Sequence, residues 1–343
     1  MSSISKSTAQ TLLAESPLLE DTALDQIALL LKDDLDQVEV EIEQRLQSQV
    51  PSVTQIAQHI VMSGGKRIRP ILLLLAAKAL NYDGPRSTFM GAAVEFIHTA
   101  TLLHDDVIDN AQLRRGRPSC NSIWDNKMSV LVGDFLYCQV SSMIAEDGDL
   151  RVLKCVTDAT ANTTEGEVLE VTKSRYLQLT ESEYYKIIEF KTGMLMSCAT
   201  QVGAILAGAD PKVENSLRDF GMNLGIAFQL ADDVLDYVSV EAEFGKEKGV
   251  DLKEGKITLP LLHAMQRCEK KETSIIREAT ISATQDIFFQ VLDVLKKYGS
   301  LEYTMELANQ RVVKTQELLE PLPDSKYKDA LLKITEYVTQ RRK

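Results

Sequence analysis

Two clusters of aspartates are the residues of this sequence best suited to metal chemistry. The first comprises Asp105, Asp106 and Asp109, and the second comprises Asp232, Asp233 and Asp236. In each cluster the first and last aspartates are four residues apart, so on a helix they share one face and repel each other. The neighbouring residues are apolar, which indicates buried helices, and burying unpaired carboxylates is costly. We therefore expect positive charge between the clusters. Mg²⁺ bound to a phosphate ester fits best, because Mg²⁺ favours carboxylates together with substrate phosphates.

Cationic side chains recur beside both clusters. They are Lys66, Arg69, Arg114, Arg115, Lys246 and Lys256. The first two lie in Gly64–Pro70, at the predicted start of a helix, where backbone N–H groups bind anions well. This segment is not a Walker A loop, because Arg67 stands where that loop requires Ser or Thr. Arginine binds phosphate in a bidentate geometry, so the repeated placement supports a site for phosphorylated ligands.

Helices must position these side chains, because apolar residues recur at helical spacing along most of the chain. Helices are predicted at 24–46, 71–80, 88–109, 127–146, 150–174, 181–207 and 213–238, with further ones from Pro260 and at 284–298, 301–319 and 325–341. Capping boxes are predicted at Ser52 with Gln55 and at Thr180 with Glu183. Residues 110–122 and 243–256 are predicted to be loops. No convincing strand or internal repeat is present. The pattern predicts a single all-α domain of ten or more helices over residues 21–343, after a flexible segment at 1–20.

The composition excludes several classes of protein. The chain has 343 residues, with 38 Lys and Arg against 50 Asp and Glu, a net charge of −12. A general nucleic-acid binder would need a basic face, so none is expected. The five cysteines show no CxxC spacing, which argues against a zinc site or a disulfide framework. The N-terminus lacks the pattern of a signal peptide, and the longest apolar run is far shorter than a membrane span. We expect a soluble, cytoplasmic protein without a transmembrane segment.

The motifs together resemble the trans-type polyprenyl diphosphate synthases, and most closely the long-chain octaprenyl type that makes quinone side chains. The matching segments, in order, are Gly64–Pro70, His98, Leu102–Asp109 with Arg114 and Arg115, Lys191 with Thr192, Phe228–Asp236 and Gly245–Pro260. The resemblance covers the chain from about residue 30 to its end. It implies an all-α bundle around a deep central cavity. It also implies an Mg²⁺-dependent prenyltransferase that joins an allylic diphosphate head to tail with successive isopentenyl diphosphates.

The resemblance further implies roles for individual residues. Asp105, Asp106 and Asp109 would bind two Mg²⁺ ions, and Asp232, with Asp233 and Asp236, would bind a third. Arg114, Lys191, Lys246 and Lys256 would hold the allylic diphosphate. Lys66, Arg69, His98 and Arg115 would hold isopentenyl diphosphate, and Thr192 and Gln229 would face the reacting carbons. No strong protein base is required, because the released diphosphate can accept the proton. His98 could instead be a polar core residue, whereas His59, His104 and His263 are expected to be structural.

Product length is expected to depend on Ala100 and Thr101, which lie about one turn before Asp105 on nearly the same helix face. Short-chain members of the family carry an aromatic residue there, so two small residues predict a medium or long product. Candidate residues for lining the tunnel, each also compatible with ordinary core packing, are Phe96, Ile97, Leu131, Val132, Leu136, Val168 and Leu169.

Four alternatives remain open at this point. A short-chain synthase making farnesyl or geranylgeranyl diphosphate would share the motifs. A class I terpene cyclase is disfavoured by the second Asp-Asp-x-x-Asp motif and by Lys66 and Arg69. A non-catalytic partner subunit is disfavoured because every motif aspartate is present, and an acidic helical scaffold would leave the buried aspartates unexplained. The resemblance also suggests a homodimer.

Overall fold

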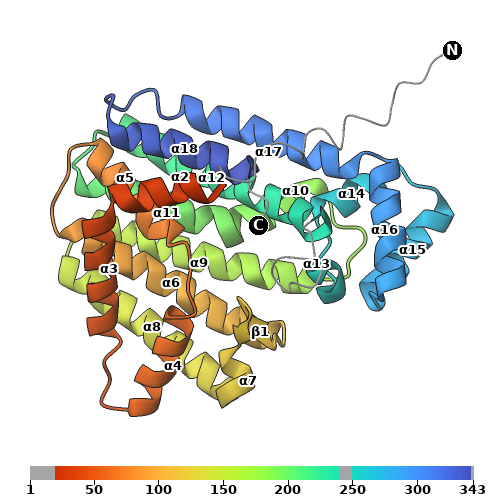
Figure 1. The fold of residues 1–343 in the computed structure, drawn as a ribbon, viewed down its shortest axis with the longest axis horizontal. Helices are drawn as coiled ribbons and strands as arrows, with labels where there is room; N and C mark the ends of the chain where they lie inside the picture. Colours follow the sequence, from red (N-terminus) through yellow and green to blue (C-terminus); the bar gives the residue numbers. More distant parts are fainter. Residues whose placement is uncertain (1–19, 239–248, 341–343) are drawn as a thin grey trace.

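The computed structural model describes residues 20–238 and 249–340, and these residues fold almost entirely into helices (Figure 1). The first half contains α2 (Glu20–Leu30), α3 (Lys32–Arg45), α4 (Pro51–Val61), α5 (Ile68–Ala79), α6 (Arg86–Ile108), α7 (Cys120–Trp124), α8 (Asn126–Asp147) and α9 (Leu150–Lys173). The second half contains α10 (Glu181–Ile188), the π-helix η1 (Glu189–Gly193), α11 (Met194–Leu206), α12 (Pro211–Val238), α13 (Val250–Glu254), α14 (Leu259–Met265), α15 (Lys270–Ile281), α16 (Gln285–Lys297), α17 (Ser300–Glu317) and α18 (Lys326–Gln340). The predicted all-α class is confirmed.

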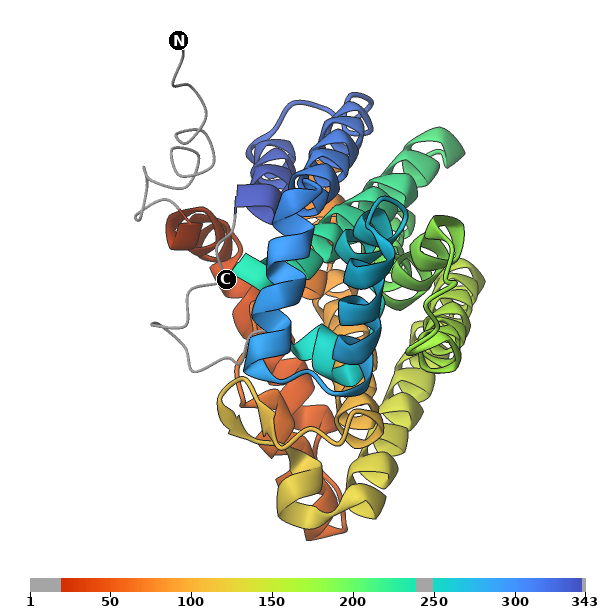
Figure 2. The ribbon, with the colours of Figure 1, turned by 90° about the vertical axis from the view of Figure 1, so that its right-hand side faces the viewer.

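The helices are stacked so that the site-bearing ones lie in the middle. Both ribbon views place α17 and α18 on one face and α4 and α7 on the opposite face, with α6, α9, α11 and α12 between them (Figures 1 and 2). Helix α5 is almost wholly buried because all of its residues from Pro70 to Ala77 are apolar. It packs on α6 and α11. Helix α12 contributes Leu224 to one hydrophobic cluster and Leu230 to the other, so it joins the two clusters.

Several local predictions need correction. The helix predicted over 24–46 is two helices, which meet at Leu31. Ser52 and Gln55 do not form a capping box: α4 begins one residue earlier at Pro51, whose missing N–H suits the first helical position. The predicted loop at 110–122 includes the first residues of α7 and a hairpin of two short strands, β1 (Leu113–Arg114) and β2 (Arg117–Pro118). The segment after Pro260 forms two helices, α14 and α15.

The capping box at Thr180 and Glu183 is confirmed, and it opens the segment that carries Lys191 and Thr192. The Thr180 side chain accepts from the Glu183 N–H, and the Glu183 side chain accepts from the Thr180 N–H. From there α10, η1 and α11 run on without a break, and the middle turn is a π-helix. Such π-turns are rare and occur often at functional sites.

Glycines allow the π-turn to pack tightly against its neighbours. A Cβ atom on Gly225 would lie 2.6 Å from the Cα of Gly193, and one on Gly166 would lie 2.8 Å from the backbone N of Lys191. Both distances are too short for real Cβ contacts, so α12 and α9 approach η1 more closely than any other residue would permit. The backbone of η1 is therefore fixed from two sides.

Helix α8 combines an apolar composition with an exposed face. It is the one helix among the described residues that is long and apolar enough to span a membrane by length and composition, with a mean hydropathy of 1.4. Within this fold it packs along α6, as a core helix does. Its side chains Val130 and Leu131 are nevertheless exposed, Leu131 by 61%.

Candidate active site

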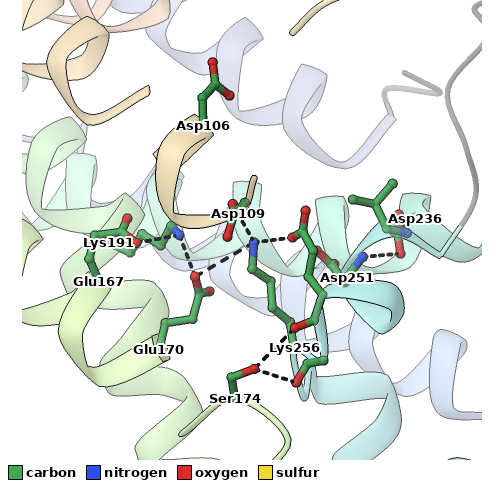
Figure 3. A network of polar contacts seen from close by, with 12 residues as sticks. Asp106, Asp109, Glu167, Glu170, Ser174, Lys191, Asp236, Asp251 and Lys256 are labelled. Atoms are coloured by element: carbon green, nitrogen blue, oxygen red, sulfur yellow. Dashed lines mark hydrogen bonds and ion pairs between the residues drawn. The ribbon is translucent and has the colours of Figure 1, made fainter. Parts of the chain in front are cut away.

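The three aspartates of the first cluster face two different environments at the C-terminal end of α6. Asp109 points toward Lys256, 3.5 Å away, whereas Asp106 points away from this group (Figure 3). The Asp106 carboxylate is fully buried and accepts hydrogen bonds from Arg114 Nε at 2.8 Å and Nη2 at 2.5 Å. Asp105 has a buried Oδ1 atom without any hydrogen-bond partner. Asp106 is engaged with Arg114 through Oδ1 alone, because its buried Oδ2 atom, like Oδ1 of Asp105, has no hydrogen-bond partner.

Two glutamates on α9 complete this side of the site, and the sequence analysis did not single them out. Lys191 Nζ lies 2.9 Å from Glu167 Oε2 and 2.6 Å from Glu170 Oε2. Lys256 Nζ lies 3.9 Å from the same Glu170 oxygen (Figure 3). The two glutamates are three residues apart and so share a helix face, but acidic pairs at this spacing are common on solvated helices. Only the packing of α9 against η1 shows that they face the lysines.

Burial and the charges of neighbouring lysines and carboxylates explain the pKa shifts of this group. Burial opposes the charged form of Lys191, but Glu170, Asp105 and Glu167 outweigh it and raise the lysine pKa. Burial raises the pKa of Glu167 to about 7, although Lys191 opposes the shift. Glu170 is also buried, yet Lys191 and Lys256 hold its pKa below the ordinary value. Both lysines are therefore charged at neutral pH and are shared among several carboxylates.

The aspartates of the second cluster, near the end of α12, differ in burial and in the kind of hydrogen-bond donor that they accept from. Asp233 is 1% exposed, and both of its oxygens accept hydrogen bonds within the protein. Asp236 is half-buried and accepts from the backbone N–H groups of Val250 and Asp251 at 3.1 and 3.3 Å. Burial raises the pKa of Asp236 to about 6, despite these two hydrogen bonds. Asp232 is half-buried on the same helix.

Asp251, at the start of α13, is a further acidic residue that the sequence analysis passed over. Burial raises its pKa well above the ordinary value, and the neighbouring carboxylates of Asp236 and Asp233 raise it further. Asp251 lies within Gly245–Pro260, one of the segments that resemble the family's motifs, and this resemblance could have pointed to it as a site residue. A group of acids that raise one another's pKa values is the environment that a divalent cation would relieve.

Thr192 and Gln229 are brought together by η1 and α12. Thr192 Oγ1 donates to Gln229 Oε1 at 2.9 Å. Both residues line a cavity of about 100 Å³ whose wall also includes Glu170, Lys191 and Lys256. The predicted pair thus adjoins the acidic and basic groups described above.

A second group of cations gathers around His98. Burial lowers the pKa of His98 well below its ordinary value, and four neighbouring guanidiniums lower it further. They belong to Arg69, Arg115, Arg114 and Arg67. The imidazole is therefore neutral at pH 7, and the concentration of guanidiniums around it favours an anion.

Arg67 differs from the other arginines because its charge is already balanced. It has a positive φ of 47° and forms ion pairs with Glu39 at 2.7 Å and Glu95 at 2.9 Å. The Nε atom of Arg69, by contrast, is buried without a hydrogen-bond partner. Lys66 donates to the Tyr337 hydroxyl of α18 at 2.5 Å. Lys66 and Arg69 thus keep most of their donors for a ligand, whereas Arg67 shapes the loop.

The remaining predicted residues have varied surroundings. Ala100 is fully buried and Thr101 donates to the His98 carbonyl. Leu131 and Val168 are 61% and 59% exposed, so the suggestion that they line an interior tunnel of the subunit is wrong. Lys246 lies outside the described residues.

The other three histidines have structural partners. His59 and His104 contact the backbone carbonyls of Pro118 and Val130. His263 is buried against the hydroxyl of Ser300 at 2.9 Å.

Comparisons with known proteins agree with this geometry. Residues 50–295 match the family model described as polyprenyl synthetase. The chain is 41% identical to the octaprenyl diphosphate synthase of Haemophilus influenzae, over 91% of this chain and 95% of that protein. The crystal structure of a decaprenyl diphosphate synthase from Rhodobacter capsulatus superposes with a TM-score of 0.89, at 39% identity over 93% of this chain and 99% of that one.

A polyprenyl synthase from Caulobacter crescentus, crystallised with calcium and isoprenyl diphosphate, gives the same TM-score of 0.89 at 38% identity, over 93% of this chain and 98% of that one. The family model covers well over half of the chain, and the identities exceed what shared folds alone produce. The chain therefore belongs to the polyprenyl synthetase family and is a prenyltransferase.

Proposed function

We propose that this enzyme joins an allylic diphosphate head to tail with successive isopentenyl diphosphates, and that it makes a medium or long all-trans chain, most closely of the octaprenyl type. The observation that carries this proposal is the pairing of two sites: carboxylates shared with Lys191 and Lys256 on one side, and guanidiniums around a neutral His98 on the other. The site with the carboxylates and lysines suits a metal-bound diphosphate, and the site around His98 suits a second diphosphate without metal.

Magnesium fits the first site. The buried Oδ1 atom of Asp105 lacks a partner, and oxygen donors from carboxylates are the ligands that Mg²⁺ prefers. Asp105 and Asp109 would hold two ions, with Asp106 orienting Arg114, and Asp232 with Asp236 would hold a third. When bound, Mg²⁺ would stabilise the negative charge of the departing diphosphate as a Lewis acid.

The lysines of the first site would exchange partners when substrate binds. Lys191 pairs with Glu167 and Glu170. Lys256 pairs with Glu254 at 2.6 Å, and lies 3.5 Å from Asp109 and 3.9 Å from Glu170. Phosphate oxygens and metal ions would take over these contacts without a large movement of either lysine. Arg114 would add a cation from the hairpin, and Lys246 is assigned here from the sequence pattern alone.

The second site would bind isopentenyl diphosphate through Lys66, Arg69, His98 and Arg115. The neutral imidazole would donate one hydrogen bond rather than a charge, since four guanidiniums already surround it. The proton lost from the isopentenyl carbon would pass to the released diphosphate, so no side chain is required as a strong base.

The quaternary structure and the cellular role are also part of this proposal. The exposed apolar side chains of α8 and α9, among them Leu131 and Val168, would be covered in a homodimer. We assign residues 21–343 to one domain and place the enzyme in the cytoplasm, where its product would serve as a quinone side chain. The octaprenyl and decaprenyl names of the relatives support the product class.

Product analysis tests the main proposal. Purified protein with Mg²⁺, an allylic primer and labelled isopentenyl diphosphate should release polyprenyl diphosphates longer than geranylgeranyl, and chelating the metal should abolish them. Labelled chains no longer than geranylgeranyl would identify a short-chain synthase. A cyclised hydrocarbon without incorporation of label would identify a terpene cyclase, and activity only after adding a second protein would identify a partner-dependent subunit.

A further inference from the structure

A buried tyrosine outside the predicted site is linked to it by consecutive hydrogen bonds. Tyr184 on α10 is 3% exposed, and its hydroxyl donates to Asp233 Oδ2 at 2.5 Å. The other oxygen, Oδ1, accepts from Gln229 Nε2 at 3.0 Å. Gln229 Oε1 in turn accepts from Thr192 Oγ1 at 2.9 Å. All four side chains line the same cavity.

The direction of each hydrogen bond follows from the chemistry of the groups. Asp233 accepts at both oxygens, from the Tyr184 hydroxyl at Oδ2 and from the amide Nε2 of Gln229 at Oδ1. The amide oxygen of Gln229 is then turned toward Thr192. A hydroxyl has one proton, and Thr192 donates it to this oxygen. The lone pairs of Thr192 are thereby left to face the rest of the cavity.

We propose that Tyr184 is a positioning residue for the reaction: through Asp233 and Gln229 it orients the Thr192 hydroxyl so that its lone pairs face the allylic carbon. This inference rests on the proposed function, in which loss of diphosphate leaves an allylic cation. Oxygen lone pairs fixed toward a developing positive charge stabilise it without reorganisation during the reaction. Asp233 is 1% exposed and accepts from two side chains of this series of hydrogen bonds, so it acts as a link in the series and not as a ligand of the third metal ion. Asp236 also accepts at both oxygens, but from backbone N–H groups, and it is half-buried.

The central experiment compares kinetics of the native protein, Tyr184→Phe and Tyr185→Phe. Tyr185 is the matched control, because it is adjacent on α10, stacks edge-on against Tyr184 and interacts with Arg311 and not with Asp233. We expect Tyr184→Phe to lower kcat by about 10- to 100-fold, as for other residues that orient a catalytic group. The KM for isopentenyl diphosphate should stay unchanged. A kcat equal to that of Tyr185→Phe would overturn the proposal.

A double-mutant cycle distinguishes positioning from a structural role. If Tyr184 acts through Thr192, then Tyr184→Phe should cost nothing further in a Thr192→Val background, because the oriented hydroxyl is already gone. Additive losses of kcat would show that Tyr184 does not act through Thr192, and they would refute the proposed series of hydrogen bonds. If Tyr184→Phe does not fold, Gln229→Met can replace it, because this substitution interrupts the same series of hydrogen bonds nearer to Thr192. Gln229→Met must then likewise cost nothing further in a Thr192→Val background.

Metal dependence tests the role of Asp233 separately. Asp233→Asn should lower kcat while leaving the Mg²⁺ concentration for half-maximal activity unchanged, whereas Asp105→Asn should raise that concentration. A raised Mg²⁺ requirement in Asp233→Asn would make Asp233 a metal ligand and overturn this part. Failure of the proposed function itself would look different, because the native protein would then form no polyprenyl diphosphate at all.

Discussion

Asp106 and Asp109 lie three residues apart on α6, yet their carboxylates have different partners. Asp106 is buried against Arg114, and Asp109 faces Lys256 (Figure 3). On α12, Asp233 accepts from the Tyr184 and Gln229 side chains, whereas Asp236 accepts from the backbone N–H groups of Val250 and Asp251. Aspartates of one Asp-Asp-x-x-Asp pattern therefore have different partners, and in the proposed function they have different tasks.

A substitution at Ala100 tests the control of product length at the residue scale. Ala100 is fully buried, so a tyrosine ring there must push into the surrounding interior, where the proposed function places the growing chain. We expect Ala100→Tyr to yield products in the farnesyl to geranylgeranyl range, measured by chromatography of the dephosphorylated alcohols.

The matched control is Thr99→Ser, which removes one methyl group next to Ala100 and should leave product length unchanged. A soluble Ala100→Tyr enzyme with the native product distribution would exclude this position as the determinant of length.

At the scale of elements, the unusual feature is the π-turn η1 inside an otherwise continuous helical segment. It carries Lys191 and Thr192 and is held by the close approach of α9 at Gly166 and of α12 at Gly225. A helix with ordinary side chains at those two glycines could not bring Lys191 to Glu170 or Thr192 to Gln229. The fold thus uses backbone contact to set the positions of the side chains assigned to the proposed site.

Gly225→Ala tests this arrangement. The new Cβ atom would lie 2.6 Å from the Gly193 Cα and 3.2 Å from the Thr192 carbonyl oxygen, so η1 and α12 must move apart. We expect a loss of about 1–3 kcal/mol in the free energy of unfolding, as for overpacked cores. Activity should fall because the Thr192–Gln229 hydrogen bond is stretched. Urea denaturation and steady-state kinetics measure the two effects.

Gly91→Ala provides the comparison for that experiment. Gly91 is also buried within a helix, but the nearest atom to its Cβ is a side-chain methyl of Val38 at 3.2 Å. A side chain can adjust by a few tenths of an ångström where a backbone cannot. Equal losses of stability in the two variants would show that the close approach at Gly225 has no special role.

At the scale of the whole molecule, the stability of the protein should depend on pH through the buried carboxyl groups of the site. Burial raises the pKa of Glu167 to about 7 and that of Asp236 to about 6, above the ordinary value of about 4 for these residues. Between about pH 4 and these raised pKa values, the two carboxyl groups keep their protons in the folded protein but lose them in the unfolded chain. The stability that these protons contribute is therefore complete below about pH 4 and disappears as the pH rises through about 6 to 7.

This linkage predicts how melting temperature depends on pH. In the presence of a chelator, the melting temperature should fall between pH 5 and pH 8, and the Glu167→Gln/Asp236→Asn variant should show a smaller fall. Mg²⁺ with inorganic diphosphate should stabilise the native protein more at pH 8 than at pH 5, because metal binding competes with protons. Thermal melts measure both effects, and a melting temperature that rises over this range would contradict the assignment.

The exposed apolar face of α8 gives a second prediction at this scale. Leu131→Glu places a charge where the proposed dimer buries a leucine, so the variant should be monomeric in multi-angle light scattering. The control is Leu29→Glu on α2, where the native leucine is 73% exposed. That variant should remain dimeric. A native protein that is itself monomeric would refute the dimer directly.

The sequence by itself determined the helical class, the positions of most helices and the residue types of the site. Helical periodicity depends on neighbours three or four residues apart, and such patterns are local. The Asp-Asp-x-x-Asp motifs were visible for the same reason, since each occupies a single turn of helix. Even the confirmed capping box at Thr180 and Glu183 is a contact between residues three apart.

The tertiary structure alone decided which of those residues work together. Glu170 lies 21 residues before Lys191 and Tyr184 lies 49 before Asp233, and no local pattern connects either pair. Their contacts depend on how closely η1 packs on α9 and α12, and that distance is set by Gly166 and Gly225 meeting a backbone. The different partners of the aspartates within each cluster have the same origin. Adjacent residues on a helix point about 100° apart, and only the surrounding helices decide which direction is the cavity.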